Sequence, residues 1–281
     1  MKKILVTGAN GQLGSELAVL SSKYPQYEWI FAERTKVTLD DLESLQNQLE
    51  DIQPDIIFNC GAYTAVDKAE TEKELAFAIN HLAVEQIAKY ALAHNVKLIH
   101  VSTDYVFDGS SAVALNEEEE TNPINVYGAS KRAGEIACLI ENPNSIIIRT
   151  SWVYSKFGNN FVKTMQRLMQ EREAINVVND QIGSPTYAAD LAQAMMDILE
   201  TSKWVPGIYN YSNEGEISWY EFALSIKELG NYNCNVGGIA SSSYPTPAKR
   251  PEFSLLDKKK IKTIYNLNIP NYKESLKKIF V

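Results

Sequence analysis

Residues 1–14 read Met1-Lys-Lys-Ile-Leu-Val-Thr-Gly-Ala-Asn-Gly-Gln-Leu-Gly14 and carry the strongest signal for the architecture. The apolar run at residues 4–6 is typical of a buried parallel strand, and residues 15–20 favour a helix. Between them lie three glycines in the spacing Gly-x-x-Gly-x-x-Gly, namely Gly8, Gly11 and Gly14. Glycines here permit a tight turn, a close approach of the backbone to a pyrophosphate, and close packing of helix on strand. This order of strand, turn and helix predicts a dinucleotide site at a helix N-terminus.

Beyond this unit, strand and helix patterns alternate. Alternation of this kind predicts an α/β fold, a doubly wound parallel sheet with helices on both faces. We expect residues 1–155 to form a dinucleotide-binding domain of the Rossmann-like type, and 156–281 to form mostly a smaller, mixed substrate-binding lobe. Segments near 174–178 and 207–212 are expected to return to the first domain. The expected strands cover 28–32, 54–59, 96–102 and 145–150, and the expected helices cover 39–49, 72–94 and 125–139.

Composition limits the kinds of partner that the chain is expected to bind. The chain has 281 residues and a formal net charge of −8, which argues against nucleic-acid binding because such proteins present a basic face. Its three cysteines are widely spaced and odd in number, so they predict neither a disulfide framework nor a metal site. No apolar stretch is long enough to span a bilayer. We therefore expect a cytoplasmic protein without nucleic-acid or membrane partners.

A candidate acid–base pair lies in Val126-Tyr-Gly-Ala-Ser-Lys-Arg132. Tyr127 and Lys131 are four residues apart, so on a helix they share a face. A nearby ammonium favours phenolate and lowers a tyrosine pKa toward the operating pH, which suits proton transfer. Ligands of such sheets lie beyond the carboxyl ends of the strands, where Thr103 would bring a hydroxyl. A hydroxyl, a phenol and an ammonium around a nicotinamide predict a carbonyl/alcohol redox site.

Several longer blocks resemble the extended short-chain dehydrogenase/reductase family. They include Val101-Ser-Thr-Asp-Tyr-Val-Phe-Asp-Gly109, Arg149-Thr-Ser-Trp-Val-Tyr154 and Asn179-Asp-Gln-Ile-Gly-Ser-Pro-Thr186, and they run to beyond residue 250. The resemblance implies reduction of the C4 ketone of a dTDP-linked 4-keto-6-deoxy sugar by NADPH or NADH. Tyr127 would donate the proton, Lys131 would lower its pKa and hold the nicotinamide ribose, and Thr103 would bind the same oxygen. Two alternatives stay open: a sugar-nucleotide epimerase or dehydratase with a retained NAD, and a non-catalytic dinucleotide-binding regulatory subunit.

The same resemblance implies binding residues. The pyrophosphate would be lined by Asn10, Gly11, Gln12 and Leu13, and the rest of the cofactor by Ala62, Tyr63 and Thr64, with Thr38 and Leu39 near the adenine. The substrate would contact Asp104 and Trp152, and its diphosphate would meet Arg250, whose guanidinium can bind such oxygens in a bidentate way.

The residues after the second strand leave the choice between NADH and NADPH open. After the second strand, Glu33 would accept from a 2′-hydroxyl and favour NADH, whereas Arg34 would take a 2′-phosphate and favour NADPH.

Some relatives dimerise through a magnesium ion held by carboxylates. Glu16 matches one such ligand, but Ala189 stands where another is needed, so we expect no metal and a solvated Glu16. A homodimer is left open.

Overall fold

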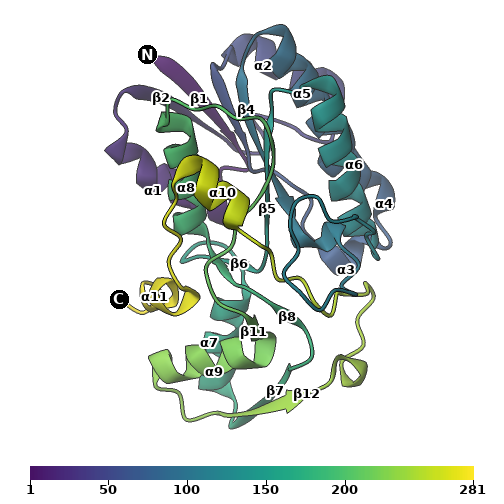
Figure 1. Cartoon of the computed structure of the whole chain (residues 1–281), viewed down its shortest axis with the longest axis vertical. Coiled ribbons are helices and arrows are strands. Elements are labelled where there is room, and N and C mark those ends of the chain that lie inside the picture. Colours follow the sequence, from purple (N-terminus) through teal and green to yellow (C-terminus); the bar gives the residue numbers. More distant parts are fainter.

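A six-stranded parallel sheet forms the centre of the larger lobe (Figure 1). The structure is a computed structural model that describes all residues 1–281. The strand order is β10-β5-β4-β3-β1-β2, and every neighbouring pair is parallel. The strands are β1 (Lys2–Thr7), β2 (Tyr27–Ala32), β3 (Ile56–Asn59), β4 (Lys97–Thr103), β5 (Ile146–Thr150) and β10 (Gly207–Asn210). All of their carboxyl ends therefore meet at one edge.

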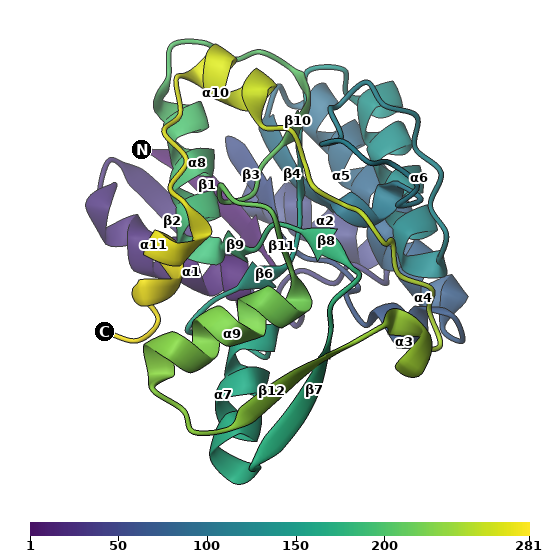
Figure 2. The same ribbon diagram turned by 60° about the horizontal axis from the view of Figure 1, so that its bottom comes forward.

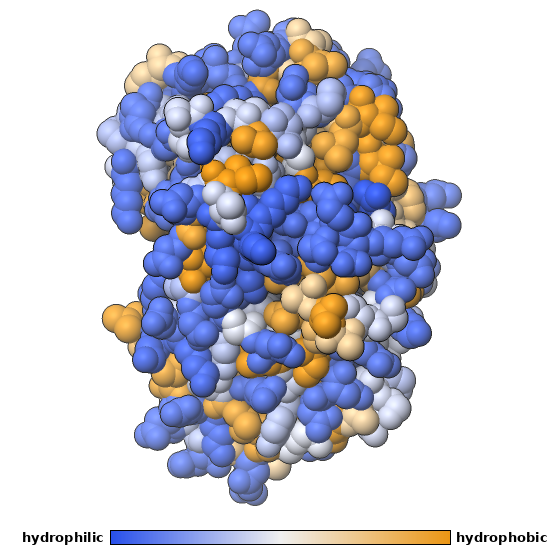
Figure 3. Space-filling model, in the orientation of Figure 1, coloured by the Kyte–Doolittle hydropathy of each residue, from blue (hydrophilic) through white to orange (hydrophobic).

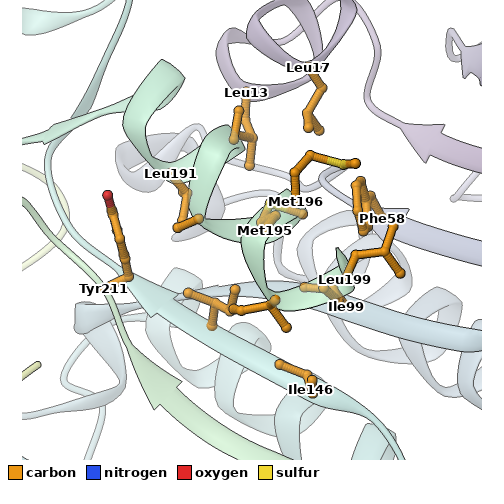
Figure 4. Packing of buried hydrophobic residues seen from close by; sticks show 14 of the residues in the cluster. Leu13, Leu17, Phe58, Ile99, Ile146, Leu191, Met195, Met196, Leu199 and Tyr211 are labelled. Atoms are coloured by element: carbon orange, nitrogen blue, oxygen red, sulfur yellow. The ribbon is translucent and has the colours of Figure 1, made fainter. Parts of the chain in front are cut away.

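Helices cover both faces of this sheet, because alternate strand residues point to opposite sides. Ile4 and Val6 pack toward α1 (Gln12–Leu20), α8 (Ala188–Glu200) and α10 (Lys259–Tyr265). Leu5 packs toward α2 (Leu42–Ile52) and α5 (Ala83–Ala93), beside α6 (Val126–Glu141). Figure 4 shows the first of these cores, where Leu13 and Leu17 of α1 gather with Met195 and Met196 of α8. The predicted doubly wound α/β sheet is confirmed.

The helix expected over 72–94 is interrupted. It consists of α4 (Lys73–Phe77), a π-helical turn (Ala78–Leu82) and α5, and it follows a short helix, α3 (Val66–Ala69). A π-turn carries one extra residue and is frequent at functional sites. Here Asn80 lies in the turn and is fully buried. Its side chain accepts from the Tyr63 N–H at 2.9 Å and donates to the Ser130 hydroxyl at 3.0 Å, so it joins the loop after β3 to α6.

The smaller lobe has its own core and lies below the sheet in Figure 2. Its helices are α7 (Phe161–Glu171) and α9 (Trp219–Gly230), with α11 (Tyr272–Lys277) beside them. Its strands form two-stranded pairs: β7 (Ala174–Val178) with β12 (Asn235–Ile239), β8 (Ile182–Gly183) with β11 (Ile217–Ser218), and β6 (Val153–Tyr154) with β9 (Thr186–Tyr187).

Strand β7 corrects one expectation. It pairs with β12 and does not return to the central sheet, so the prediction for 174–178 was wrong, whereas β10 does lie beside β5. The residues of β7 alternate between exposed and buried, which is typical of a strand covered on one face only. The central strands β3 and β5 are buried throughout. No helix of the structure is both long and apolar enough to cross a membrane.

Candidate active site

A cavity of about 970 Å³ runs along the carboxyl ends of the sheet strands, from the glycine turn to the smaller lobe. Most of the predicted site residues line it. From the turn these are Gly8, Asn10, Gly11, Gln12, Leu13 and Gly14. From later strand ends they are Arg34, Leu39, Ala62, Tyr63, Thr64, Thr103, Asp104, Tyr127, Lys131 and Trp152. Glu33, Thr38 and Arg250 are not among its lining residues.

The glycine turn fits a dinucleotide. Gly8 has φ +67°, a conformation that side-chain-bearing residues rarely adopt, and a Cβ there would lie 2.7 Å from the Cα of Gly61. A Cβ on Gly14 would lie 2.4 Å from the carbonyl oxygen of Gly8. The turn and α1 are thus packed backbone against backbone. Helix α1 has no side-chain cap, so its first N–H groups are left to bind an anion in the cavity.

Arg34 and Glu33 differ in their relation to the cavity. Arg34 lines it and forms an ion pair with Asp40. This guanidinium is largely exposed, and an exposed pair of this kind contributes little, so it is free to exchange partners. The cationic side chain therefore faces the cofactor half of the cavity, and the carboxylate of Glu33 does not line it.

Tyr127, Lys131 and Thr103 are brought together as predicted by their spacing and strand position. Asn125 caps the start of α6 by accepting from the Gly128 N–H at 2.7 Å, which fixes the turn that carries Tyr127. The Tyr127 ring packs edge-on against Tyr105, with centroids 5.6 Å apart. Lys131 is 2% exposed and donates to the Val101 carbonyl at 2.7 Å. Thr103 is buried at the end of β4 and donates to Asp104 at 3.0 Å.

Burial sets the protonation of this site. It raises the pKa of Tyr127 to about 12, while a hydrogen bond with Thr103 opposes the rise. It lowers the pKa of Lys131 to about 8. The expectation that Lys131 lowers the Tyr127 pKa is thus not met here, because desolvation of the phenol is the larger effect. At neutral pH Tyr127 is a protonated phenol with a proton to give. Burial also raises the pKa of Asp104 to about 6.

Trp152 lines the same cavity as this group. Its backbone has φ +47°, which is rare for a bulky residue and costs about 1–3 kcal/mol. Its indole stacks on that of Trp219, with centroids 3.6 Å apart and planes inclined by 13°. Trp219 also lines the cavity and was missed from the sequence. The only available signal was its place directly after Ser218, which caps α9.

Arg250 is held outside the cavity. Its guanidinium donates to both carboxylate oxygens of Asp67, at 3.1 and 2.9 Å, and to the Ala248 carbonyl at 3.0 Å. Lys68, the next residue to Asp67, lines the cavity and forms no ion pair. Sequence reasoning had not singled out this second cation, although it lies in the loop that follows β3.

Glu16 corrects another expectation. It is 6% exposed and accepts a hydrogen bond from the Ser155 hydroxyl at 2.6 Å, so the prediction of a solvated residue was wrong. The reason is that this face of α1 packs against the chain that follows β6. Burial raises the pKa of Glu16. No cluster of three or more His, Cys, Asp or Glu side chains in the structure is arranged to hold a metal ion.

Comparison with known proteins gives concordant results. Over 99% of its length the chain is 40% identical to a dTDP-4-dehydrorhamnose reductase of Aggregatibacter actinomycetemcomitans, covering 98% of that protein. It is 41% identical to the protein of the same name from Sinorhizobium fredii, covering 99% of this chain and 96% of the relative. Among solved structures, a dTDP-4-dehydrorhamnose reductase of Bacillus anthracis in complex with NADP superposes with a TM-score of 0.94. It is 40% identical, and the match covers 100% of this chain and 99% of that one.

A more distant likeness supports the fold alone. The UDP-glucose 4-epimerase of Thermus thermophilus, in complex with NAD, is 18% identical and gives a TM-score of 0.84, with 99% of this chain and 97% of that one covered. A family model described as RmlD substrate binding domain matches residues 1–281. The resemblance drawn from the sequence is confirmed, and the chain belongs to the RmlD substrate binding domain family.

Proposed function

We propose that the chain catalyses the reduction of the C4 ketone of dTDP-4-dehydro-L-rhamnose by NADPH or NADH, giving dTDP-L-rhamnose. The observation that carries the proposal is the meeting of Thr103, Tyr127 and Lys131 in one cavity with the glycine turn. The names of the relatives supply the substrate, and the NADP complex of one of them agrees with a nicotinamide cofactor.

The residues divide the work as follows. The nicotinamide, when bound, supplies the hydride that goes to C4 of the sugar. Tyr127 gives its phenolic proton to the C4 oxygen, and the Thr103 hydroxyl holds that oxygen. Lys131 holds the nicotinamide ribose. Asp104 and Trp152 contact the sugar, Asn10 to Leu13 line the pyrophosphate, Ala62 to Thr64 run along the cofactor, and Leu39 lies near the adenine.

An assay that follows both the absorbance of the reduced cofactor and the formation of the sugar product tests this function. The purified chain is given NADPH or NADH with a small panel of 4-keto-6-deoxy sugar nucleotides, and the reduced cofactor is followed against the alcohol formed. We expect one reduced cofactor to be consumed for each dTDP-L-rhamnose. Isomerised or dehydrated sugar without net cofactor consumption would instead indicate an epimerase or dehydratase. Tight cofactor binding without turnover, together with a co-purifying partner enzyme, would indicate a regulatory subunit.

The choice of cofactor is predicted to depend on Arg34. Because this cation lines the cavity and Glu33 does not, we expect NADPH to be preferred over NADH. Arg34→Ala should raise the KM for NADPH about tenfold or more, the usual effect of losing hydrogen bonds to a charged group, and leave the KM for NADH unchanged. Lys36→Ala, an exposed cation of the same loop, is the matched control. Equal effects of Arg34→Ala on both cofactors would contradict the assignment.

Arg250 is proposed to bind the substrate diphosphate by exchanging its partner. Its guanidinium already forms a bidentate pair with Asp67, a geometry that a diphosphate can reproduce. Arg250→Ala is expected to raise the KM for the sugar nucleotide about tenfold, again the worth of charge-assisted hydrogen bonds, without changing the KM for NADPH. Steady-state kinetics of Lys68→Ala provide the comparison. A large effect of Lys68→Ala beside no effect of Arg250→Ala would place the diphosphate on Lys68 instead.

A homodimer and a cytoplasmic location complete the proposal. The dimer is supported by apolar side chains that stay exposed on α5 and α6, namely Leu92, Ile136 and, at 71% exposed, Ile140. A hydrophobic area lies over these helices at the upper right of Figure 3. Light scattering of the purified chain measures the mass, and a monomer at all concentrations would contradict the dimer.

The three free cysteines support a cytoplasmic location, which is a reducing compartment, and cell fractionation tests this location.

A further inference from the structure

The backbone of Trp152 is held in an unfavourable conformation, so its surroundings must fix the indole. We propose that Trp219 and Gly183 form a slot that sets the plane of the Trp152 indole against the sugar, which makes Trp219 a positioning residue for the substrate. The inference rests on the proposed function, in which Trp152 contacts the sugar. It adds Trp219, which belongs to α9 of the smaller lobe, to the residues that shape the sugar site.

The slot has two walls. The Trp219 ring stacks on one face of the Trp152 indole, with centroids 3.6 Å apart and planes inclined by 13°. Gly183 is also close, because a Cβ there would come within 3.0 Å of Cε2 and Cζ2 of the Trp152 indole. That distance is shorter than ordinary van der Waals contact, so only glycine leaves the ring its present place. The indole is therefore confined by both residues, Trp219 over one face and Gly183 beside Cε2 and Cζ2.

The walls themselves are fixed by the smaller lobe. Trp219 is the first residue of α9, and Ser218 and Glu221 close a capping box there: the Ser218 N–H donates to the Glu221 carboxylate at 2.7 Å, and the Glu221 N–H donates to the Ser218 hydroxyl at 3.2 Å. Phe161 of α7 packs against the Trp219 ring with centroids 4.6 Å apart. Gly183 pairs with Ile217 across the β8–β11 ladder, so both walls are anchored next to each other.

The position of the slot explains its use. Trp152 follows the end of β5, and Thr150 of that strand pairs with Thr103 at the end of β4. A sugar held by Thr103 and Tyr127 thus has the indole as its apolar neighbour. A deoxy sugar presents C–H groups and a methyl group that an aromatic surface can cover, and its oxygens remain free for the hydroxyls and Asp104. A tilted indole would shift the C4 oxygen relative to Thr103.

Steady-state kinetics of Trp219→Ala test the inference. We expect the KM for the sugar nucleotide to rise about two- to tenfold, the range set by the usual strength of an aromatic pair. The KM for NADPH and the inhibition constant of dTDP, which lacks the sugar, should stay unchanged. Trp219→Phe keeps an aromatic wall and should restore the wild-type KM. Gly183→Ala places a methyl group against the Trp152 indole, so it should also raise the KM for the sugar nucleotide, and it is the variant to measure if Trp219→Ala does not fold.

Three results would overturn the inference. An unchanged KM for the sugar nucleotide in both Trp219→Ala and Gly183→Ala would show that the indole needs no slot. A parallel rise in the dTDP inhibition constant would show a general disturbance of the lobe. A wild-type chain that reduces no sugar nucleotide would remove the proposed function and this inference with it, whereas the first two results leave that function intact.

Discussion

Tyr127→Phe is expected to lower kcat by about 10²–10⁴-fold, the usual contribution of a positioned acid or base. The substitution removes only the hydroxyl, and the ring keeps its edge-on packing against Tyr105. Burial raises the Tyr127 pKa to about 12, so the wild-type group is protonated at neutral pH and can give its proton to the developing alkoxide. Phenylalanine has no proton to give. Turnover is followed by NADPH absorbance, and cofactor binding by NADPH fluorescence should stay near wild type.

Tyr105→Phe is the matched control for this experiment. Tyr105 also lines the cavity and is in contact with Tyr127, but it is not part of the helical pair with Lys131. Its hydroxyl should therefore be dispensable for chemistry. Equal losses of kcat in the two variants, or an undiminished kcat in Tyr127→Phe, would show that another group donates the proton.

Glu135→Leu should destabilise the folded chain by about 3–5 kcal/mol, because it leaves a buried charge without its partner. Arg149 is 1% exposed and Glu135 is fully buried. The guanidinium donates to both carboxylate oxygens at 2.8 Å and lies over the Phe107 ring at 5.1 Å. The third guanidinium nitrogen, Nη1, has no hydrogen-bond partner, so Glu135 is the one group to which the Arg149 side chain donates. Urea unfolding of the chain measures the free energy of unfolding.

The double variant Glu135→Leu/Arg149→Met controls for the loss of packing. It removes both charges and fills the space with apolar groups, so it should recover much of the stability lost in Glu135→Leu. A double variant as unstable as the single one would mean that packing, not the unpaired charge, dominates. Arg132, the partly exposed second partner of Glu135 at 3.1 Å, is unchanged in both proteins.

Sequence reasoning works best for this chain where the signal is local. The glycine turn predicts its backbone, since Gly8 and Gly14 are needed at close approaches that no Cβ would allow. The spacing of Tyr127 and Lys131 places both on one helix face, and strand order brings Thr103 to the same edge. Each of these statements depends only on the period of a helix or on the common direction of parallel strands.

The missed features depend on contacts between distant segments. The burial of Glu16 follows from packing of α1 against the chain after β6, and no residue near Glu16 signals it. The stacking of Trp219 on Trp152 joins two segments that are remote in sequence. The Tyr127 pKa depends on burial in the folded chain, because desolvation of the phenol has a larger effect on this pKa than the neighbouring side chains have. The pairing of β7 with β12 likewise depends on which sheet edge is free in the folded chain.

The place of β10 in the chain has a consequence for biosynthesis. This strand completes the central sheet beside β5, and α8 covers one face of the sheet, yet both come after most of the segments that start the smaller lobe. A ribosome therefore releases β1 to β5 before it has made β10, the last strand of the central sheet. Until α8 has also emerged, the apolar residues on one face of the nascent sheet stay exposed. Exposed surfaces of this kind favour aggregation and chaperone binding. Arrest of translation before residue 188 should thus yield a nascent chain that chaperones hold, and arrest after residue 281 has emerged should yield one that resists protease.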